Sequence, residues 1–196
     1  FLTIAGTRQN VIVTGTGKTR LRTIDDDADD IDGSLTLSVL RNALEVVRYI
    51  TGNAPSSLGL HPAVYFYNEK GKYNRFLFLG MVMLITEKLR NNDRNFFRNF
   101  TIKRQQIEAF LIDNKSLIGI LLQYIWKFAN RVHKMRDLLS FLVVEYTAGR
   151  TVSPEEAISH LGLQGKILDV SSTNAPVDFS DETKSMVFLR QALASA

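Results

Sequence analysis

A continuous apolar run in the middle of the chain is the feature that most constrains its fold. From residue 76 to residue 85 every side chain is apolar except at Gly80. A helix at a protein surface shows a polar stripe, so a helix without one is expected to be surrounded by protein. The run is also shorter than the roughly 20 residues that a membrane span needs. The sequence therefore predicts a buried central helix around which other elements pack.

The stretch before this run is rich in aromatic residues. Residues 63–67 are β-branched and aromatic, which favours a short strand, and residues 68–71 form a predicted turn with Gly71 at positive φ. The aromatic side chains could be a stacking platform for nucleobases or core packing beside the central helix. We favour core packing, because only alternate residues of a strand can face a ligand. The aromatic residues concerned are Tyr65, Phe66, Tyr67 and Tyr73.

Apolar residues at helical spacing predict most of the other elements. Helices are expected at 35–51, 96–114, 116–128 and 133–147, with a short one from Pro154 that begins at a capping box of Ser153 and Glu156, and a last one at 181–195. Ser34 is the expected N-cap of the first. Short strands are expected at 1–4 and 11–13, and a strand or extended arm at 166–170. The side chains expected to face inward are Leu37, Leu40, Leu44, Val47, Ile50; Phe100, Ile107, Phe110, Leu111; Leu117, Leu121, Ile125, Phe128; Met135, Leu138, Leu139, Leu142, Val143 and Tyr146.

These elements predict a mainly α fold, a helical bundle with minor β structure near the N-terminus and around 63–67. An apolar content of 45% in 196 residues supports a core of its own. We divide the chain into an N-terminal extended segment and acidic linker at 1–33, the helical bundle at 34–150, and a C-terminal helical appendage at 151–196 that leads to a further domain. The chain does not begin with Met, and we expect it to be a piece of a longer protein.

Two glycine- and acid-rich segments resemble ligand loops but lack key residues. The segment GTGKT at 15–19 would need its first phosphate-loop glycine at position 12, which is Ile12, so a mobile basic loop with Arg20 and Arg22 is expected instead. The acidic run at 25–33 would place Ala28 and Val39 at the end positions of a calcium loop, where ligands are required. We expect a solvated acidic linker there, whose charge also favours the start of the next helix.

No residue pattern in the chain predicts catalysis. The chain has no Cys, so it holds no thiol nucleophile, disulfide or Cys-ligated zinc, and it fits a cytoplasmic protein. Its three His residues, His61, His133 and His160, show no metal-ligand spacing. No metal and no cofactor are therefore expected in this segment, and no membrane association.

Positive charge is the one distributed feature that suggests a partner. One basic group precedes and enters the helix at 96–114, and another begins the helix at 133–147 with no acid before Asp137. If the groups share a face, they can contact the phosphates of DNA; the alternative is an ordinary solvated surface. The candidate nucleic-acid-binding residues are Arg90, Arg94, Arg98, Lys103, Arg104, Lys127, Arg131, Lys134 and Arg136, and the groups also contain Lys88 and His133.

The segment GLHPAVYFYNEKGK at 59–72, followed by the apolar helix, resembles the helical portion of GmrSD-type proteins. These are bacterial multidomain proteins in which a ParB-like domain precedes a helical region. The segment FSDETKSMVFLRQALASA at 179–196 is similar to the lead-in to their HNH nuclease domain. The resemblance implies DNA restriction and defence against phage. It carries over no catalytic residue, because this chain has neither the Asp-Gly-Gln-Gln-Arg motif of the first domain nor the metal-binding His motif of the second.

Three functions are consistent with these features. The first is a helical connector of a DNA-restriction or anti-phage defence protein, non-catalytic by itself, which contacts DNA backbone and other domains of a parent NTP-dependent or HNH endonuclease. The second is a protein–protein interaction or oligomerisation module that binds no nucleic acid, for example a homo-oligomer. The third is an enzyme whose site combines His61, Tyr65 and Tyr67 with acidic residues. A clustered basic face favours the first, and an exposed apolar patch the second.

Overall fold

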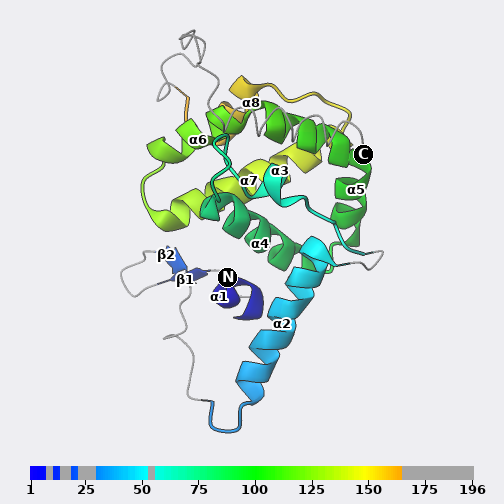
Figure 1. The fold of residues 1–196 in the computed structure, drawn as a ribbon, viewed down its shortest axis with the longest axis vertical. Helices are drawn as coiled ribbons and strands as arrows, with labels where there is room; N and C mark the ends of the chain where they lie inside the picture. The colour runs from blue at the N-terminus through cyan, green and yellow to red at the C-terminus, as the bar shows by residue number, and fades with distance from the viewer. Residues whose placement is uncertain (8–10, 14–18, 22–29, 53–55, 165–196) are drawn as a thin grey trace.

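The chain is mainly α-helical in a computed structural model that describes residues 1–7, 11–13, 19–21, 30–52 and 56–164. This confirms the predicted fold class (Figure 1). Within the described residues there are eight helices and one antiparallel hairpin, in which Ile12 pairs with Arg20. The elements are α1 (Leu2–Thr7), β1 (Val11–Val13), β2 (Thr19–Leu21), α2 (Ser34–Thr51), α3 (Pro62–Tyr65), α4 (Arg75–Arg90), α5 (Arg94–Asp113), α6 (Lys115–Tyr124), α7 (Phe128–Thr147) and α8 (Pro154–His160).

Helix α4 is the buried central helix that its composition predicts. Its residues from Met81 to Ile85 are each at most 1% exposed. The helix begins where the Asn74 side chain accepts hydrogen bonds from the backbone nitrogens of Phe76 and Leu77. Helix α7 crosses it at Gly80, where an added Cβ would lie 2.7 Å from the Met135 Cβ. The glycine therefore permits the close approach of the two helices that form the centre of the body (Figure 1).

Helices α5, α6, α7 and α8 complete the core around α4. Every side chain predicted to face inward from the segments 96–114 and 133–147 is buried. The predicted capping box at the start of α8 is present, with Ser153 and Glu156 each bonding the other's backbone nitrogen. The apolar side chains of α8 and the turn after it, Ala157, Leu161 and Leu163, join the same core.

Two predicted strands are helices instead. Residues Pro62–Tyr65 form α3, since Pro62 takes the first helical position, where its fixed φ suits a helix and its missing N–H is not needed. A single β-bridge between Tyr67 and Tyr73 remains, closed by the predicted turn with Gly71 at φ 66°. The N-terminal segment predicted as a strand forms α1, which packs on α2 and α4. The predicted strand at 11–13 is confirmed as β1, and Arg20, expected in a loop, lies in β2.

The connection between α6 and α7 differs from the predicted one. Helix α6 ends at Tyr124, since Ile125 is extended and Lys127 has φ 70°. Helix α7 then begins at Phe128, five residues before the expected start. Phe128 was expected to face inward and is 42% exposed. The break turns the chain so that Phe128 lies at the beginning of α7 and packs beside the beginning of α4.

Helix α2 buries a face that shares only Ile50 with the predicted one. Ala43, Val46 and Ile50 are buried, and the helix projects from the body with α1 alongside it (Figure 1). The predicted Ser34 cap is replaced by two preceding aspartates: Asp32 accepts from the Ser34 nitrogen, and Asp30 accepts from the nitrogens of the next two residues. The side chains predicted inward but exposed are Leu37, Leu40, Leu44 and Val47, at 53%, 48%, 48% and 39%.

Several predictions concern residues outside the described ones. They are the arm at 166–170, the last helix at 181–195, the loop at 14–18 and most of the acidic run. The division of the chain at 33 and 150 stays a prediction. In the part of the chain that the structure describes, no helix is both long and apolar enough to cross a membrane.

Candidate nucleic-acid interface

Two arginines and two phenylalanines gather where α4 and α7 begin. The rings of Phe76 and Phe128 have centroids 5.2 Å apart. The Arg75 guanidinium lies 5.0 Å from the Phe76 centroid and 5.1 Å from that of Phe128. The Arg131 guanidinium lies 5.2 Å from the Phe76 centroid. These distances are within the range of cation–π attraction, so each ring helps to fix a cation. We call these four residues the Arg–Phe cluster.

The break between α6 and α7 fixes Arg131 a second time. Its Nε donates a hydrogen bond of 2.9 Å to the backbone oxygen of Ile125, the extended residue that ends α6. With Nε held and the guanidinium carbon 5.2 Å from the centroid of the Phe76 ring, the guanidinium has little freedom left. A planar fork fixed in this way loses less entropy when its terminal nitrogens bind a phosphate in a bidentate geometry.

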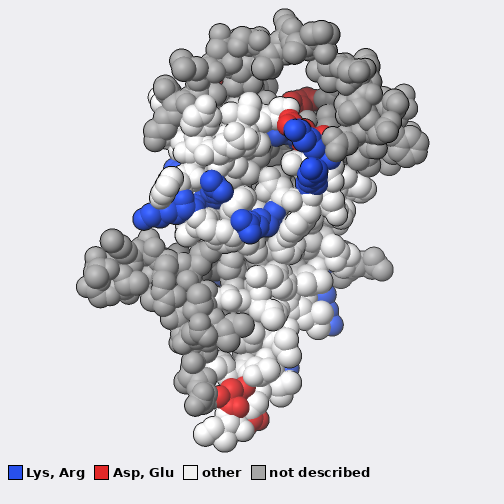
Figure 2. All heavy atoms as spheres, turned by 60° about the vertical axis from the view of Figure 1, so that its left-hand side comes forward, with Lys and Arg blue, Asp and Glu red and all other residues white. Residues whose placement is uncertain are grey.

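Aromatic and basic side chains are exposed next to the Arg–Phe cluster in the chain. Tyr124 is 49% and Trp126 81% exposed, and Lys127 is exposed at a strained backbone position. Non-glycine residues at positive φ are found preferentially at functional sites. Figure 2 shows Lys and Arg side chains across the middle of the face that lies at the left of Figure 1. Cations interleaved with exposed aromatic rings are typical of surfaces that bind nucleic-acid strands.

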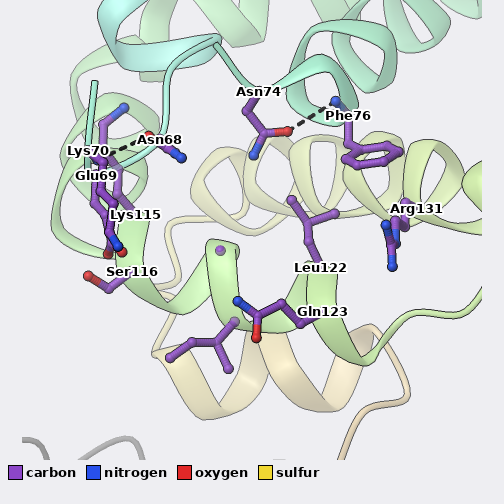
Figure 3. Close-up of a pocket in the computed structure, with 12 residues that line it drawn as sticks. Asn68, Glu69, Lys70, Asn74, Phe76, Lys115, Ser116, Leu122, Gln123 and Arg131 are labelled. Atoms are coloured by element: carbon purple, nitrogen blue, oxygen red, sulfur yellow. Dashed lines mark hydrogen bonds between the residues drawn. The ribbon is translucent and has the colours of Figure 1, made fainter. Parts of the chain in front are cut away.

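A groove of about 360 Å³ adjoins the cluster between α6 and the segment that precedes α4 (Figure 3). Phe76 and Arg131 belong to both. The rest of the lining combines polar side chains with an apolar floor from α6. The residues that line the groove are Asn68, Glu69, Lys70, Asn74, Phe76, Lys115, Ser116, Gly119, Ile120, Leu122, Gln123 and Arg131.

Lys115 has a structural part in the groove wall. Its Nζ donates hydrogen bonds to the backbone oxygens of Ala63, Val64 and Tyr67, at 2.6, 3.1 and 2.6 Å. It therefore joins α6 to the end of α3 and the start of the bridge. Burial lowers the pKa of Lys115 to about 8. Since all three ammonium protons have acceptors, this lysine holds the wall in place and offers none to a ligand.

The first predicted basic group lies at the other end of α4. Arg90 ends that helix, and Arg94 and Arg98 are exposed on the first turns of α5. At 1.5 Å per residue, α4 separates Arg90 from Arg75 by roughly 20 Å. Lys88 is held by Asp93 at 3.1 Å and by the Phe96 ring. Arg90, Arg94 and Arg98 thus lie at the opposite end of the central helix from Arg75.

Two further predicted residues, Lys103 and Arg104, are half-buried on α5. Arg104 lies near the pair formed by Tyr65, whose hydroxyl donates to the Glu108 carboxylate at 3.0 Å. Burial first, and the Glu108 charge second, raise the pKa of Tyr65 well above its usual range. Tyr65 is therefore a core residue, as the core-packing alternative predicted, whereas Tyr67 and Tyr73 are 38% and 55% exposed.

The second predicted group divides along α7. Arg136 donates to Glu87 at 2.6 Å, and its Nε lies 2.9 Å from Asp137. Burial and the Arg136 charge lower the pKa of His133, and Lys134 is half-buried. Only Lys127 and Arg131 of this group lie at the beginning of α7. Its positive charge is therefore less available than the run of basic residues suggests.

Sequence reasoning missed Arg75, Phe76 and Phe128. The only local signal is an arginine directly before the apolar run, and nothing in the sequence links that position to residue 131. The site proposed from His61, Tyr65 and Tyr67 does not line the groove. Among the described residues, no group of three or more His, Asp or Glu side chains could hold a metal ion.

In comparisons with known proteins, no family model, no curated protein and no solved structure matches this chain. We therefore base the binding site proposed below on the geometry of the described residues.

Proposed function

We propose that this chain is a non-catalytic helical connector that contacts nucleic acid at the beginning of α4 and α7. The observation that supports it is the Arg–Phe cluster, in which Arg75 and Arg131 are fixed against two rings at the surface. An exposed arginine, Arg75, and a half-buried one, Arg131, both pre-ordered and next to the exposed Lys127, favour phosphate, which binds through charge and planar hydrogen bonding. The resemblance of residues 59–72 and 179–196 to GmrSD-type proteins makes a DNA-restriction or defence protein our proposed parent.

Phosphate contact by this cluster predicts binding that weakens steeply with salt. Log affinity falls linearly with log salt on duplex DNA, and each phosphate contact makes that fall steeper by about 0.9. The cluster supplies two arginines, so replacing both with Ala makes the fall of log affinity with log salt shallower by about 2. Trp126 is the only tryptophan of the chain, and it is two residues before Phe128. Its fluorescence therefore reports binding at this end of the molecule.

The experiment compares three proteins on a labelled DNA duplex between about 50 and 200 mM salt. They are the wild type, the double variant Arg75→Ala/Arg131→Ala, and the matched control Arg94→Ala/Arg98→Ala at the far end of α4. We expect the first variant alone to lose affinity and slope, and Trp126 fluorescence to change on binding. Absence of wild-type binding at the lowest salt, with an intact fold by circular dichroism, would overturn the proposal. A loss confined to the control would move the interface to α5.

An exposed apolar stripe on α2 favours self-association as a second function. Leu37, Leu40, Leu44 and Val47 recur at intervals of three, four and three residues, which is the spacing of a coiled-coil seam. The occupant we propose is α2 of a second copy in antiparallel orientation. That orientation brings the acidic start of one helix, with Asp30 and Asp32, toward Arg48 near the end of the other, so the charges at the two ends are complementary.

A further inference from the structure

We infer that the groove beside the Arg–Phe cluster accepts an unpaired nucleotide of a single strand, whose phosphate lies on Arg131. The inference rests on the proposed function and deepens it, because it names the form of nucleic acid that this end of the molecule prefers. Phosphate contacts alone do not distinguish single strands from duplexes; a pocket that encloses one base does, since a paired base cannot enter it.

The groove has the size and the chemistry for one base. Its volume of about 360 Å³ is at the lower end of the range for small-molecule sites, about 300–1,000 Å³. Phe76, Ile120 and Leu122 supply apolar surface for the flat face of a base, and Ser116 and Gln123 supply polar atoms for its edge. Binding pockets for extruded bases combine these two kinds of contact.

Two asparagines present donors to the groove in a fixed orientation. Asn68 Oδ1 accepts from the backbone nitrogens of Lys70 and Lys72 at 3.0 and 2.9 Å. Asn74 Oδ1 accepts from Phe76 at 3.0 Å in capping α4. With each oxygen held by the backbone, the amide nitrogen is the end directed at the groove, as Figure 3 shows for both residues. Two pre-ordered N–H donors suit the carbonyl oxygens and ring nitrogens of a base edge.

Arg131 joins the groove to the phosphate site. It lines the groove, and its guanidinium also lies against the Phe76 ring in the cluster. A nucleotide whose phosphate binds Arg131 therefore has its base within reach of the groove. The neighbouring nucleotides of the same strand would meet Trp126 and Tyr124, exposed rings on which bases can stack.

Gly119 provides a direct test, because it lies in the groove wall with open space in front of it. No atom lies within 4 Å of the position that a Cβ at residue 119 would take. Gly119→Leu therefore extends a side chain into the groove from an unobstructed Cβ position on α6, and both Leu and Ala favour a helix over Gly. The matched control is Gly119→Ala, which adds one methyl group and leaves most of the volume open.

The measurement is the affinity of wild type and both variants for a labelled DNA strand of about 12 nucleotides, and for its duplex. We expect wild type to bind the strand more tightly than the duplex by about tenfold, the value of one stacked and enclosed base. Gly119→Leu removes this preference and leaves duplex affinity and its salt dependence unchanged. Gly119→Ala keeps the preference.

The outcomes separate this inference from the function on which it rests. Equal wild-type affinity for strand and duplex, or a preference that Gly119→Leu leaves intact, overturns the groove assignment while nucleic-acid binding stands. No binding to either overturns both. A free nucleoside monophosphate is the competitor that distinguishes the source of the ligand. If the nucleoside monophosphate displaces the strand when both supply the same concentration of phosphate groups, the groove is a site for free nucleotides and the strand proposal is wrong.

Discussion

A single lysine joins three parts of the chain at the groove. Lys115 is 9% exposed, and its ammonium donates to three backbone oxygens at the end of α3 and the start of the β-bridge. The Ala63 and Val64 oxygens belong to the last turn of α3 and the Tyr67 oxygen lies just beyond it, where carbonyls have no partner within the helix. The side chain supplies the missing donors. The same burial opposes its charge, which is why the pKa of Lys115 is lowered from 10.5 to about 8.

This lowered pKa predicts a particular dependence of stability on pH. Below pH 8 the lysine is protonated in both the folded and the unfolded protein. Between about pH 8 and 10.5 the unfolded chain binds more protons than the folded one, so the free energy of unfolding rises with pH in that window. The shift corresponds to a rise of roughly 3 kcal/mol.

The test is urea unfolding of wild type and Lys115→Met from pH 7 to pH 10.5. At pH 7 we expect the variant to be less stable by about 1–3 kcal/mol, because the buried carbonyls lose their donor. The difference in the free energy of unfolding between the two proteins should then grow as the pH rises, because Lys115 is present only in wild type. Subtracting the variant removes the contribution of other groups, such as the tyrosines. A difference that stays constant over the whole range would mean that burial does not disfavour the charge.

At the scale of helices, the packing of α4 against α7 depends on one residue without a side chain. An added Cβ at Gly80 would lie 2.7 Å from the Met135 Cβ and 2.9 Å from the backbone nitrogen of Arg136. The second of these atoms is backbone, so it cannot move aside by a change of rotamer. Close-packed helices resist such an insertion at a cost of typically 1–3 kcal/mol.

Gly80→Ala is therefore expected to lower the free energy of unfolding by about 1–3 kcal/mol, despite the higher helix propensity of Ala. Gly119→Ala is the matched comparison, because its Cβ meets nothing within 4 Å. That variant should be more stable than wild type by up to about 1 kcal/mol. Urea midpoints of the two variants measure the difference. Equal effects of the two substitutions would show that α4 and α7 do not pack as closely as described.

Helices were predictable from the sequence where they are strongly buried, either along one face or on every side. The pattern in α7 identifies all of its buried residues except Val132, which precedes the expected helix start, and the all-apolar run identifies α4 as central. The pattern in α2 predicts an apolar face correctly but not its environment, because Leu40 and Leu44 have the same spacing whether the body or a partner covers them. In α3, the strand propensity of Val64 and Tyr65 is overridden by Pro62 at the first helical position.

The candidate site was only partly predictable for a different reason. Lys127 and Arg131 were identified by charge, whereas Arg75, Phe76 and Phe128 become neighbours only through the crossing of α4 and α7. No local pattern contains that contact. The sequence also overstates how many basic side chains can bind a ligand, because it does not reveal that Arg136 is held by Glu87 and Asp137.

At the scale of the whole molecule, α2 and the Arg–Phe cluster suggest how binding and self-association combine. If two copies pair through α2, each dimer carries two clusters. A duplex long enough to reach both binds the second cluster as an intramolecular event, which raises the apparent affinity without any new contact. The stripe on α2 would then strengthen nucleic-acid binding although none of its residues contacts the ligand.

Leu40→Glu/Leu44→Glu tests this arrangement, because it places two like charges in the middle of the proposed seam at positions that are each 48% exposed. We expect wild type to be dimeric by light scattering at high protein concentration, and the variant to be monomeric with its fold intact. Its affinity for a long duplex should fall by tenfold or more, whereas its affinity for a duplex that reaches only one cluster should not change. Ser38→Glu, also exposed on α2 but off the stripe, is the control and should stay dimeric. Wild type that is monomeric at every concentration would contradict the pairing through α2. That result would not bear on the Arg–Phe cluster, which the Arg75→Ala/Arg131→Ala variant tests separately.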